Sequence, residues 1–243
     1  MSDHRPVVNI AHRGASAYAP ENTFAAFDLA LAMAADGLET DLRLTADGCV
    51  VLMHDETVDR TTDGKGKLAN LTLAQVRALD AGSWFSPEFA GERVPTLVEF
   101  LAAFGGCVPL VLEVKDAGCV ELALREVLAR GYLYTVTFTA FAIEPLERIL
   151  ALEPSARTGY LVMEANSALM RELVGKGVTQ VCPRANVITP EMVKAAHAAG
   201  LEVRAWGVRD EELMLRVLDA GADGMTVNWP DILRAELMRR DTI

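Results

Sequence analysis

The feature that most constrains this chain is an alternation along its whole length. Short apolar runs, typical of buried strands, are followed by segments whose apolar residues have helical spacing. We predict strands at 7–11, 38–44, 49–53, 109–114, 133–138, 158–162, 178–182, 201–208 and 224–227. We predict helices at 23–35, 120–130, 143–152, 167–175, 189–199, 210–220 and 230–239. About eight β/α units in 243 residues favour a closed (β/α)8 TIM barrel. An open doubly wound sheet is the competing architecture, but no GxGxxG motif follows a strand.

One segment interrupts the alternation. Residues 55–94 are rich in turn-forming glycine, proline and aspartate, and the segment is too long for an ordinary connecting loop. It contains one plausible short helix, 73–79, with Thr72 as its N-cap. We therefore expect a single domain spanning residues 1–243, with an insertion at about 55–94 that covers one end of the barrel.

Composition and charge indicate which kinds of binding partner and cellular location the chain is suited to. The net charge of −11 disfavours nucleic acid and anionic membranes, because the surface field repels polyanions. The four cysteines form no CxxC pair, and no stretch approaches the roughly 20 apolar residues of a membrane span. The polar N-terminus lacks a signal-length apolar segment. These observations predict a cytoplasmic protein without a membrane span, and they leave its oligomeric state open.

Three carboxylates fall near the ends of predicted strands. Glu39 and Asp41 are two residues apart, so both point to one face of their strand, and Glu113 follows on the next barrel strand. Three charged, unpaired carboxylates in one interior would repel strongly. A bound divalent cation resolves this repulsion, and oxygen ligands favour Mg²⁺ first, with Ca²⁺ or Mn²⁺ as alternatives to it. A salt-bridged interior without metal is the competing interpretation.

Two histidines and two cations occupy similar positions. His12 and His54 directly follow apolar runs, and an imidazole pair suits acid–base work at phosphorus because its pKa lies near neutrality. Arg13 offers a planar fork for phosphate oxygens and Lys115 a point charge. For Arg13 the structural alternative is a partner for a nearby carboxylate. The other two histidines, His4 and His197, are interpreted as uninvolved.

The combination and order of these residues along the chain match the motifs of one protein family. The stretch "AHRGASAYAPENTFAAF…GLETDLRLTADGCVVLMHDETVDRTTDGKG" resembles the glycerophosphodiester phosphodiesterase family, and so do "LVLEVK", "AHAAGLEVRAWGV" and "GADGMTVNWPD" further along. The resemblance runs from the first strand to the last and implies a TIM barrel with a small inserted subdomain. It implies metal ligation by Glu39, Asp41 and Glu113, an acid–base pair of His12 and His54, and phosphate contacts from Arg13 and Lys115.

The resemblance adds three residues. Glu21, in the "PENT" motif, holds Arg13 or a histidine in place, or only orders the loop. Trp206 matches an aromatic residue that lines the glycerol side of the family's pocket. A Ser-Phe pair common in the family is Ala140-Phe141 here, so the serine's hydrogen bond is lost while Phe141 can keep an apolar wall.

The implied reaction is hydrolysis of a glycerophosphodiester to sn-glycerol 3-phosphate and an alcohol. Attack by water and attack by the neighbouring glycerol hydroxyl both remain open; His12 is favoured as base and His54 as acid.

A barrel phosphodiesterase of the lysophospholipase D type, acting on lysophospholipids, would use the same residues but would need an apolar rim. A non-catalytic metal-binding barrel is the non-enzyme alternative, and retention of both histidines argues against it.

Overall fold

The protein is a closed barrel of parallel strands surrounded by helices. The computed structural model describes residues 7–241, so His4 lies outside the described residues. Hydrogen bonding joins the strands in the order β1-β9-β8-β7-β6-β5-β4-β2, and pairing of β1 with β2 closes the ring. The barrel strands are β1 Val8–His12, β2 Gly37–Leu44, β4 Leu110–Val114, β5 Val136–Ala140, β6 Arg157–Val162, β7 Gln180–Pro183, β8 Glu202–Val208 and β9 Gly224–Val227. The TIM barrel predicted from the alternation is confirmed.

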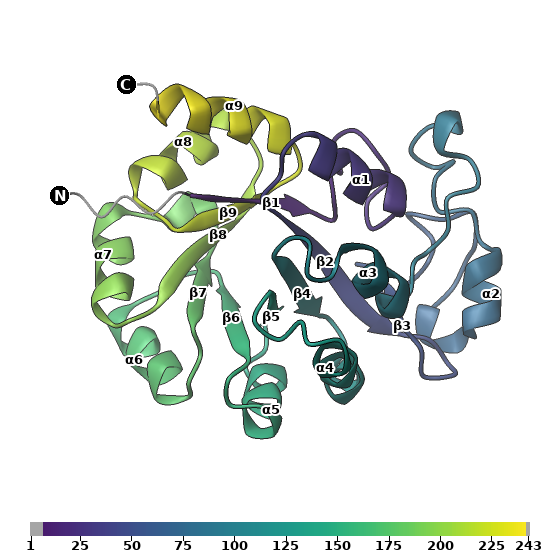
Figure 1. Cartoon of the computed structure of the whole chain (residues 1–243), viewed down its shortest axis with the longest axis horizontal. Helices are drawn as coiled ribbons and strands as arrows, with labels where there is room; N and C mark the ends of the chain where they lie inside the picture. The colour runs from purple at the N-terminus through teal and green to yellow at the C-terminus, as the bar shows by residue number, and fades with distance from the viewer. Residues whose placement is uncertain (1–6, 242–243) are drawn as a thin grey trace.

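The helices lie outside the ring of strands (Figure 1). They are α1 Phe24–Ala32, α3 Leu97–Phe104, α4 Val120–Ala129, α5 Glu144–Leu152, α6 Ser167–Gly175, α7 Pro190–Ala198, α8 Glu211–Asp219 and α9 Pro230–Asp241. Aromatic packing joins the first two, since the rings of Phe27 and Phe100 lie 4.7 Å apart and both side chains are fully buried. No helix within residues 7–241 has the length and apolar character needed to cross a bilayer.

Some of the predicted elements need correction. Helix α3 was not predicted, although Thr96 and Glu99 form a capping box at its start and Leu97, Phe100 and Leu101 are buried at helical spacing. Helix α1 is shorter than 23–35 because Ala34 adopts a left-handed conformation, φ 57°, that ends it. Strand β5 lies about three residues later than the predicted 133–138.

The interrupting segment lies beside the barrel. Strand β3, Val50–Leu52, pairs antiparallel with β2 outside the ring, and the chain then forms α2, Leu73–Ala78, before it returns at α3. Figure 1 shows α2 to one side of the barrel. The segment has a hydrophobic cluster of its own with the residues around β3, formed by Val51, Met53, Val58, Leu68, Val76, Ala81 and Val94. We propose on this basis that residues 55–94 are an insertion within one domain that spans the chain.

Candidate active site

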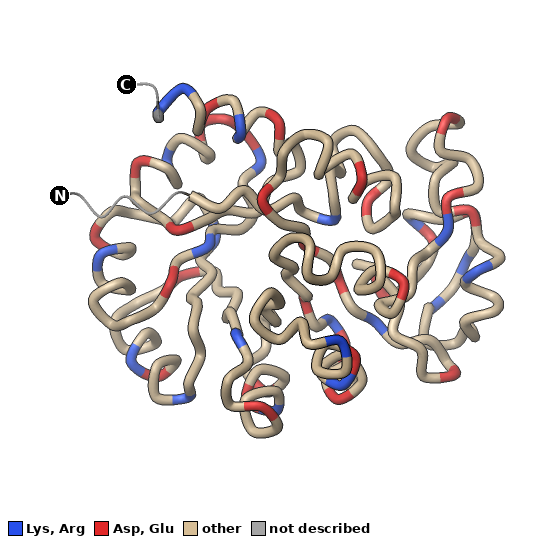
Figure 2. The backbone as a smooth tube through the Cα atoms, viewed as in Figure 1, with Lys and Arg blue, Asp and Glu red and all other residues tan. Residues whose placement is uncertain are grey.

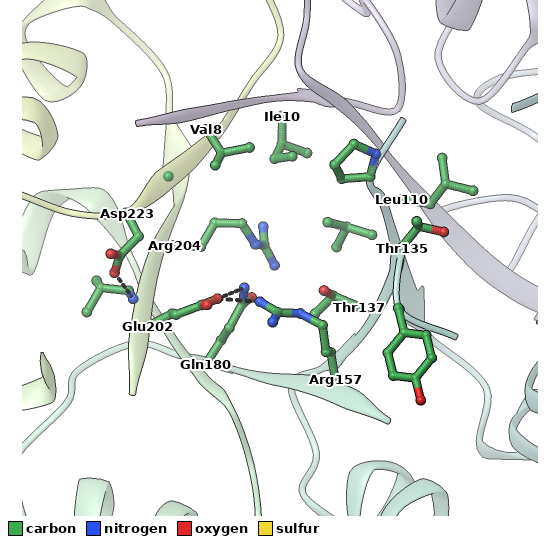
Figure 3. Close-up of a pocket in the computed structure, with 15 residues that line it drawn as sticks. Val8, Ile10, Leu110, Thr135, Thr137, Arg157, Gln180, Glu202, Arg204 and Asp223 are labelled. Atoms are coloured by element: carbon green, nitrogen blue, oxygen red, sulfur yellow. Dashed lines mark hydrogen bonds and ion pairs between the residues drawn. The ribbon is translucent and has the colours of Figure 1, made fainter. Parts of the chain in front are cut away.

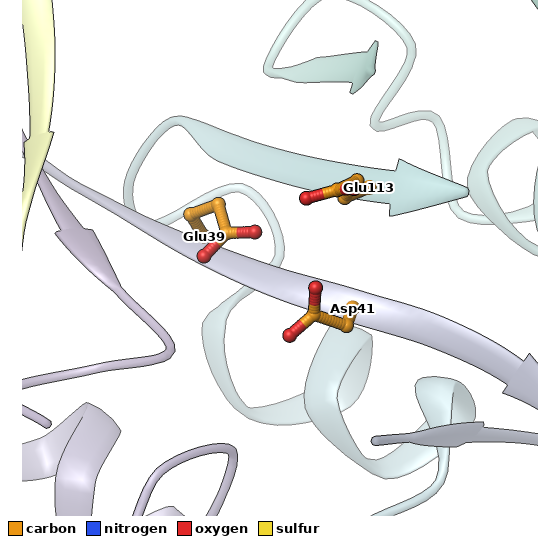
Figure 4. Close-up of side chains that lie close together, drawn as sticks. All are labelled: Glu39, Asp41 and Glu113. Carbon is orange, nitrogen blue, oxygen red and sulfur yellow. The ribbon is translucent and has the colours of Figure 1, made fainter. Parts of the chain in front are cut away.

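The three predicted metal-ligating carboxylates meet inside the barrel. Asp41 on β2 is the register partner of Glu113 on β4, and Glu39 lies two residues earlier on the same face of β2. One oxygen from each lies within 4.8 Å of the others, and the three residues are 3%, 0% and 7% exposed. Figure 4 shows the three side chains gathered between β2 and β4.

The charges of this cluster are unequal. Burial and the nearby Asp41 carboxylate raise the pKa of both Glu39 and Glu113. Burial acts on Asp41 in the same direction, but the positive charges of Arg13 and Lys115 outweigh it and lower the pKa of Asp41 to about 2. The shifts of Glu39 and Glu113 favour their protonated forms, and a cation bound between the three carboxylates would oppose these shifts.

The donor set fits a hard divalent cation. Asp41 Oδ1 and Glu113 Oε1 are buried and accept no hydrogen bond within the described part of the chain. The Lys115 ammonium lies 3.4 Å from Asp41 Oδ1 and 2.5 Å from Glu113 Oε1. Buried carboxylate oxygens with unused lone pairs are the ligands that Mg²⁺, Ca²⁺ and Mn²⁺ prefer.

Arg13 is held by carboxylates on two sides. Its Nε lies 3.0 Å from Asp41 Oδ2 and its Nη1 donates to Glu21 Oε1 at 3.0 Å. The pairing that the sequence left as the structural alternative for Arg13 is thus present. The backbone here is left-handed, with φ 57° at Arg13 and 82° at Gly14. A Cβ on Gly14 would lie 2.5 Å from the backbone of Ala26, so this turn requires glycine.

The two histidines flank the cluster. His12 ends β1, and its Nδ1 bonds to Asn228 Oδ1 at 2.7 Å while its Nε2 lies 4.0 Å from Glu39 Oε2. His54 follows β3, and its Nδ1 bonds to Asp55 Oδ1 at 2.7 Å. Burial lowers the pKa of both imidazoles. When Nδ1 donates to an oxygen, Nε2 is left unprotonated on a neutral ring, which is the form a general base requires.

A chain of ion pairs joins the insertion to this site. Arg60 contacts both Glu21 and Asp55 at 2.7 Å, so it links the residue that holds Arg13 to the residue that holds His54. Glu21 therefore holds Arg13, one of the alternatives left open by the sequence. Arg60 was not predicted as a site residue, because only the folded chain brings the insertion beside the "PENT" loop. Asp55 was not predicted either, although it directly follows His54 in the sequence.

We expect Arg60→Ala to lower kcat/KM about tenfold, since a half-exposed pair network contributes on the scale of a few charge-assisted hydrogen bonds. Loss of Arg60 frees Asp55 and Glu21, so His54 and Arg13 become less well oriented. Steady-state kinetics on a diester of the class that the sequence resemblance implies, such as glycerophosphocholine, measure this, with Arg125→Ala on the exposed face of α4 as the charge-matched control. Unchanged kinetics in Arg60→Ala would show that the ion pairs of Arg60 do not contribute to catalysis.

An aromatic wall stands at the same barrel end. Phe141 directly follows β5 and its ring meets Trp206 of β8 edge to face at 4.9 Å. Trp206 Nε1 donates to the carbonyl of Val162, and Lys115 Nζ lies 5.6 Å from the Phe141 ring centroid. The structure thus brings both predicted aromatic residues beside the charged cluster. Arg184, which directly follows β7, covers the Trp206 ring at 5.8 Å.

Arg184 and Asn228 were both missed by the sequence analysis. Each directly follows a barrel strand, β7 and β9 respectively, so the strand-end position that singled out His12 was also the signal for them. The Asn228 amide carries no titratable group that would draw attention to it, whereas the Arg184 guanidinium is of the same chemical type as that of Arg13.

The fold and the site together define a class of protein. Carboxylates that can hold a hard cation, two fixed cations and two histidines at the carboxyl end of a TIM barrel suit hydrolysis of a phosphate ester. The model of the glycerophosphoryl diester phosphodiesterase family matches residues 12–232. The chain belongs to this family and is a phosphoric diester hydrolase.

Individual relatives agree with this placement. The chain is 35% identical to the glycerophosphodiester phosphodiesterase of Caldanaerobacter subterraneus subsp. tengcongensis, over 92% of this chain and 95% of that one. An Oleispira antarctica phosphodiesterase, solved in complex with the product sn-glycerol-3-phosphate, superimposes with a TM-score of 0.85 at 32% identity and covers 96% of this chain and 97% of its own. A glycerophosphodiester phosphodiesterase from Agrobacterium tumefaciens has the same TM-score at 29% identity, covering 94% and 99%.

Proposed function

We propose that this protein hydrolyses glycerophosphodiesters to sn-glycerol 3-phosphate and an alcohol, with the help of one divalent cation. The observation that carries the proposal is the buried Glu39–Asp41–Glu113 cluster with Arg13 and Lys115 against it. The sn-glycerol-3-phosphate bound by the Oleispira relative is consistent with this substrate class.

Glu39, Asp41 and Glu113 would hold the cation, with Mg²⁺ as the first choice and Ca²⁺ or Mn²⁺ as alternatives. When bound, the metal supplies positive charge that polarises the phosphate and stabilises the negative charge of the transition state. With the carboxylates compensated in this way, Arg13 and Lys115 offer donors to the phosphate oxygens. A guanidinium has five N–H groups, and Arg13 uses only some of them on Asp41 and Glu21.

The histidines would move the protons. We assign His12 as the base, which takes the proton of the attacking hydroxyl at Nε2 while Asn228 holds Nδ1. We assign His54 as the acid, which protonates the departing alcohol, and Asp55 stabilises the protonated form of its ring. The attacking hydroxyl is that of water or of the substrate's own glycerol.

Trp206 and Phe141 would bind the glycerol moiety, because an aromatic face packs against the C–H side of a polyol. We expect glycerophosphocholine and glycerophosphoethanolamine to be cleaved with similar kcat/KM. The glycerol-free diester bis(p-nitrophenyl) phosphate should lose kcat as well as affinity, since binding energy from the glycerol positions the phosphate.

The same substrates should be compared in Trp206→Ala. The preference for glycerol-containing diesters should fall in this variant, whereas Trp84→Ala in the insertion is the matched control. A headgroup preference beyond about 100-fold, which corresponds to about 3 kcal/mol, contradicts the open-headgroup expectation. Faster cleavage of a lysophospholipid than of glycerophosphocholine would favour the lysophospholipase D alternative.

We further propose a cytoplasmic location and no nucleic-acid partner. The four cysteines are unpaired, as expected in a reducing compartment. Basic and acidic residues are interspersed over the outer helices in Figure 2, and the net charge of −11 opposes binding of a polyanion.

A further inference from the structure

A cavity lies at the end of the barrel opposite the candidate active site. It has a volume of about 320 Å³ and is lined by residues that begin the strands, including Val8, Leu110, Gln180, Glu202 and Gly224. The candidate active site lies at the carboxyl ends of the strands, so the two sites are separated along the barrel interior. Figure 3 shows the cavity ringed by these strands, with the Arg204 side chain reaching into its centre.

Arg204 is a buried cation with neutral partners only. It is 5% exposed, and its Nη1 and Nη2 donate to the Thr226 hydroxyl and the Cys182 sulfur. Its Nε has no acceptor, and no carboxylate of residues 7–241 forms an ion pair with it. A buried charge is costly unless an opposite charge compensates it, so this guanidinium is the feature of the cavity that calls for a ligand.

The carboxylates that line the cavity are already engaged. Glu202 accepts from Arg157 at 2.6 Å and from the Gln180 side-chain amide at 2.8 Å. Asp223 accepts from the backbone of Val203 at 2.7 Å and bonds to His197 at 2.8 Å. Glu202 is thus paired with a cation and Asp223 has two hydrogen-bond partners, whereas Arg204 has no carboxylate partner among the cavity-lining residues described.

The shape and the remaining polar atoms limit what can bind. Gln180 is 9% exposed, and its Oε1 is a buried acceptor without a hydrogen bond within the described chain, just as Arg204 Nε is a buried donor without one. A rotation of either side chain toward the cavity would give that atom to a ligand. Apolar side chains such as Val8, Ile10 and Leu110 form much of the wall. A volume of this size is at the lower end for small-molecule pockets, which are about 300–1,000 Å³.

From this geometry we propose that the amino-terminal end of the barrel binds a small organic oxyanion that also carries a hydroxyl group. The guanidinium of Arg204 takes the carboxylate or phosphate, because its planar fork matches either group. The hydroxyl donates to Gln180 Oε1, and a body of about three carbons lies against the apolar wall. This site is independent of the proposed hydrolysis.

Calorimetric titration of the full-length protein in the presence of chelator tests the proposal with two probes, D-glycerate for the carboxylate class and sn-glycerol 3-phosphate for the phosphate class. We expect saturable binding of at least one, and the stronger probe identifies the head group. The same binding should persist in Lys115→Met, which removes a proposed phosphate-binding cation of the catalytic cleft and so separates the two sites. Arg204→Met should weaken it at least about tenfold.

Arg148→Met on α5 removes the same charge far from the cavity and should leave binding unchanged. If Arg204→Met does not fold, as judged by circular dichroism, a crystal of the unsubstituted protein with the stronger probe replaces it, and density for the anion against Arg204 is expected. Binding of neither probe, binding unaffected by Arg204→Met, or a cavity that holds only water in that crystal would each overturn the proposal.

Discussion

Asp41→Asn is expected to lower turnover of glycerophosphocholine by at least about 100-fold, the scale on which loss of one preorganised electrostatic contact acts. Asp41 is fully buried and lies within 3.0 Å of Arg13 and 3.4 Å of Lys115. It also accepts a hydrogen bond from Asn22 at 3.0 Å. The substitution therefore removes a proposed metal ligand and, at the same time, the anion that positions both phosphate-binding cations.

Two measurements accompany the kinetics of Asp41→Asn. Titration with Mg²⁺ or Mn²⁺ should show weakened metal binding, and circular dichroism should show whether the barrel stays folded despite two partly unpaired cations. Asp28→Asn on the exposed side of α1 makes the same change in net charge and should retain normal turnover. Near-normal turnover in Asp41→Asn would mean that the acidic cluster only stabilises the barrel.

The second large effect concerns the histidines. His12→Ala and His54→Ala should each lower kcat by about 100-fold or more, because general acid–base groups contribute about 10²–10⁴. Neither residue belongs to the acidic cluster, so metal binding should be largely retained. His197→Ala on α7 is the control, since this histidine bonds to Asp223 away from the cleft.

A change of leaving group separates the two roles. A glycerol phosphodiester with a p-nitrophenyl leaving group needs no proton on departure, so it should restore much of the rate in His54→Ala but little in His12→Ala. Restoration in His12→Ala alone would reverse the assignment of base and acid. Near-normal turnover of glycerophosphocholine in either variant would remove that residue from catalysis.

Much of the site could be predicted because its residues end or follow strands. The spacing of Glu39 and Asp41 placed both on one face, and register pairing of Asp41 with Glu113 brings the third carboxylate beside them. Arg60 could not be predicted in this way, because it belongs to the insertion and reaches Glu21 only after the segment folds back onto the barrel. Long-range contacts of this kind leave no local periodicity.

Some elements of the fold could likewise be predicted from the sequence, and others could not. Alternating apolar runs were sufficient for the barrel. Strand β5 begins later than predicted because residues 132–135 form a turn, closed by a hydrogen bond from the Thr135 N–H to the Tyr132 carbonyl, and the buried Leu133 in that turn has the apolar character of a strand residue. Helix α3 did carry a sequence signal, its Thr96–Glu99 capping box, which was overlooked beside the turn-rich insertion. The cavity around Arg204 had no such signal, since a lone arginine in a strand does not reveal that its neighbours are neutral.

The most direct test of the account is release of sn-glycerol 3-phosphate from glycerophosphocholine by the purified protein, before and after exhaustive chelation. We expect release that chelation abolishes and that Mg²⁺, Mn²⁺ or Ca²⁺ restores, with the restored rate saturating as the metal occupies one site per chain. Full activity after chelation would contradict the proposed role of Glu39, Asp41 and Glu113, and no release under any metal condition would contradict the proposed reaction itself.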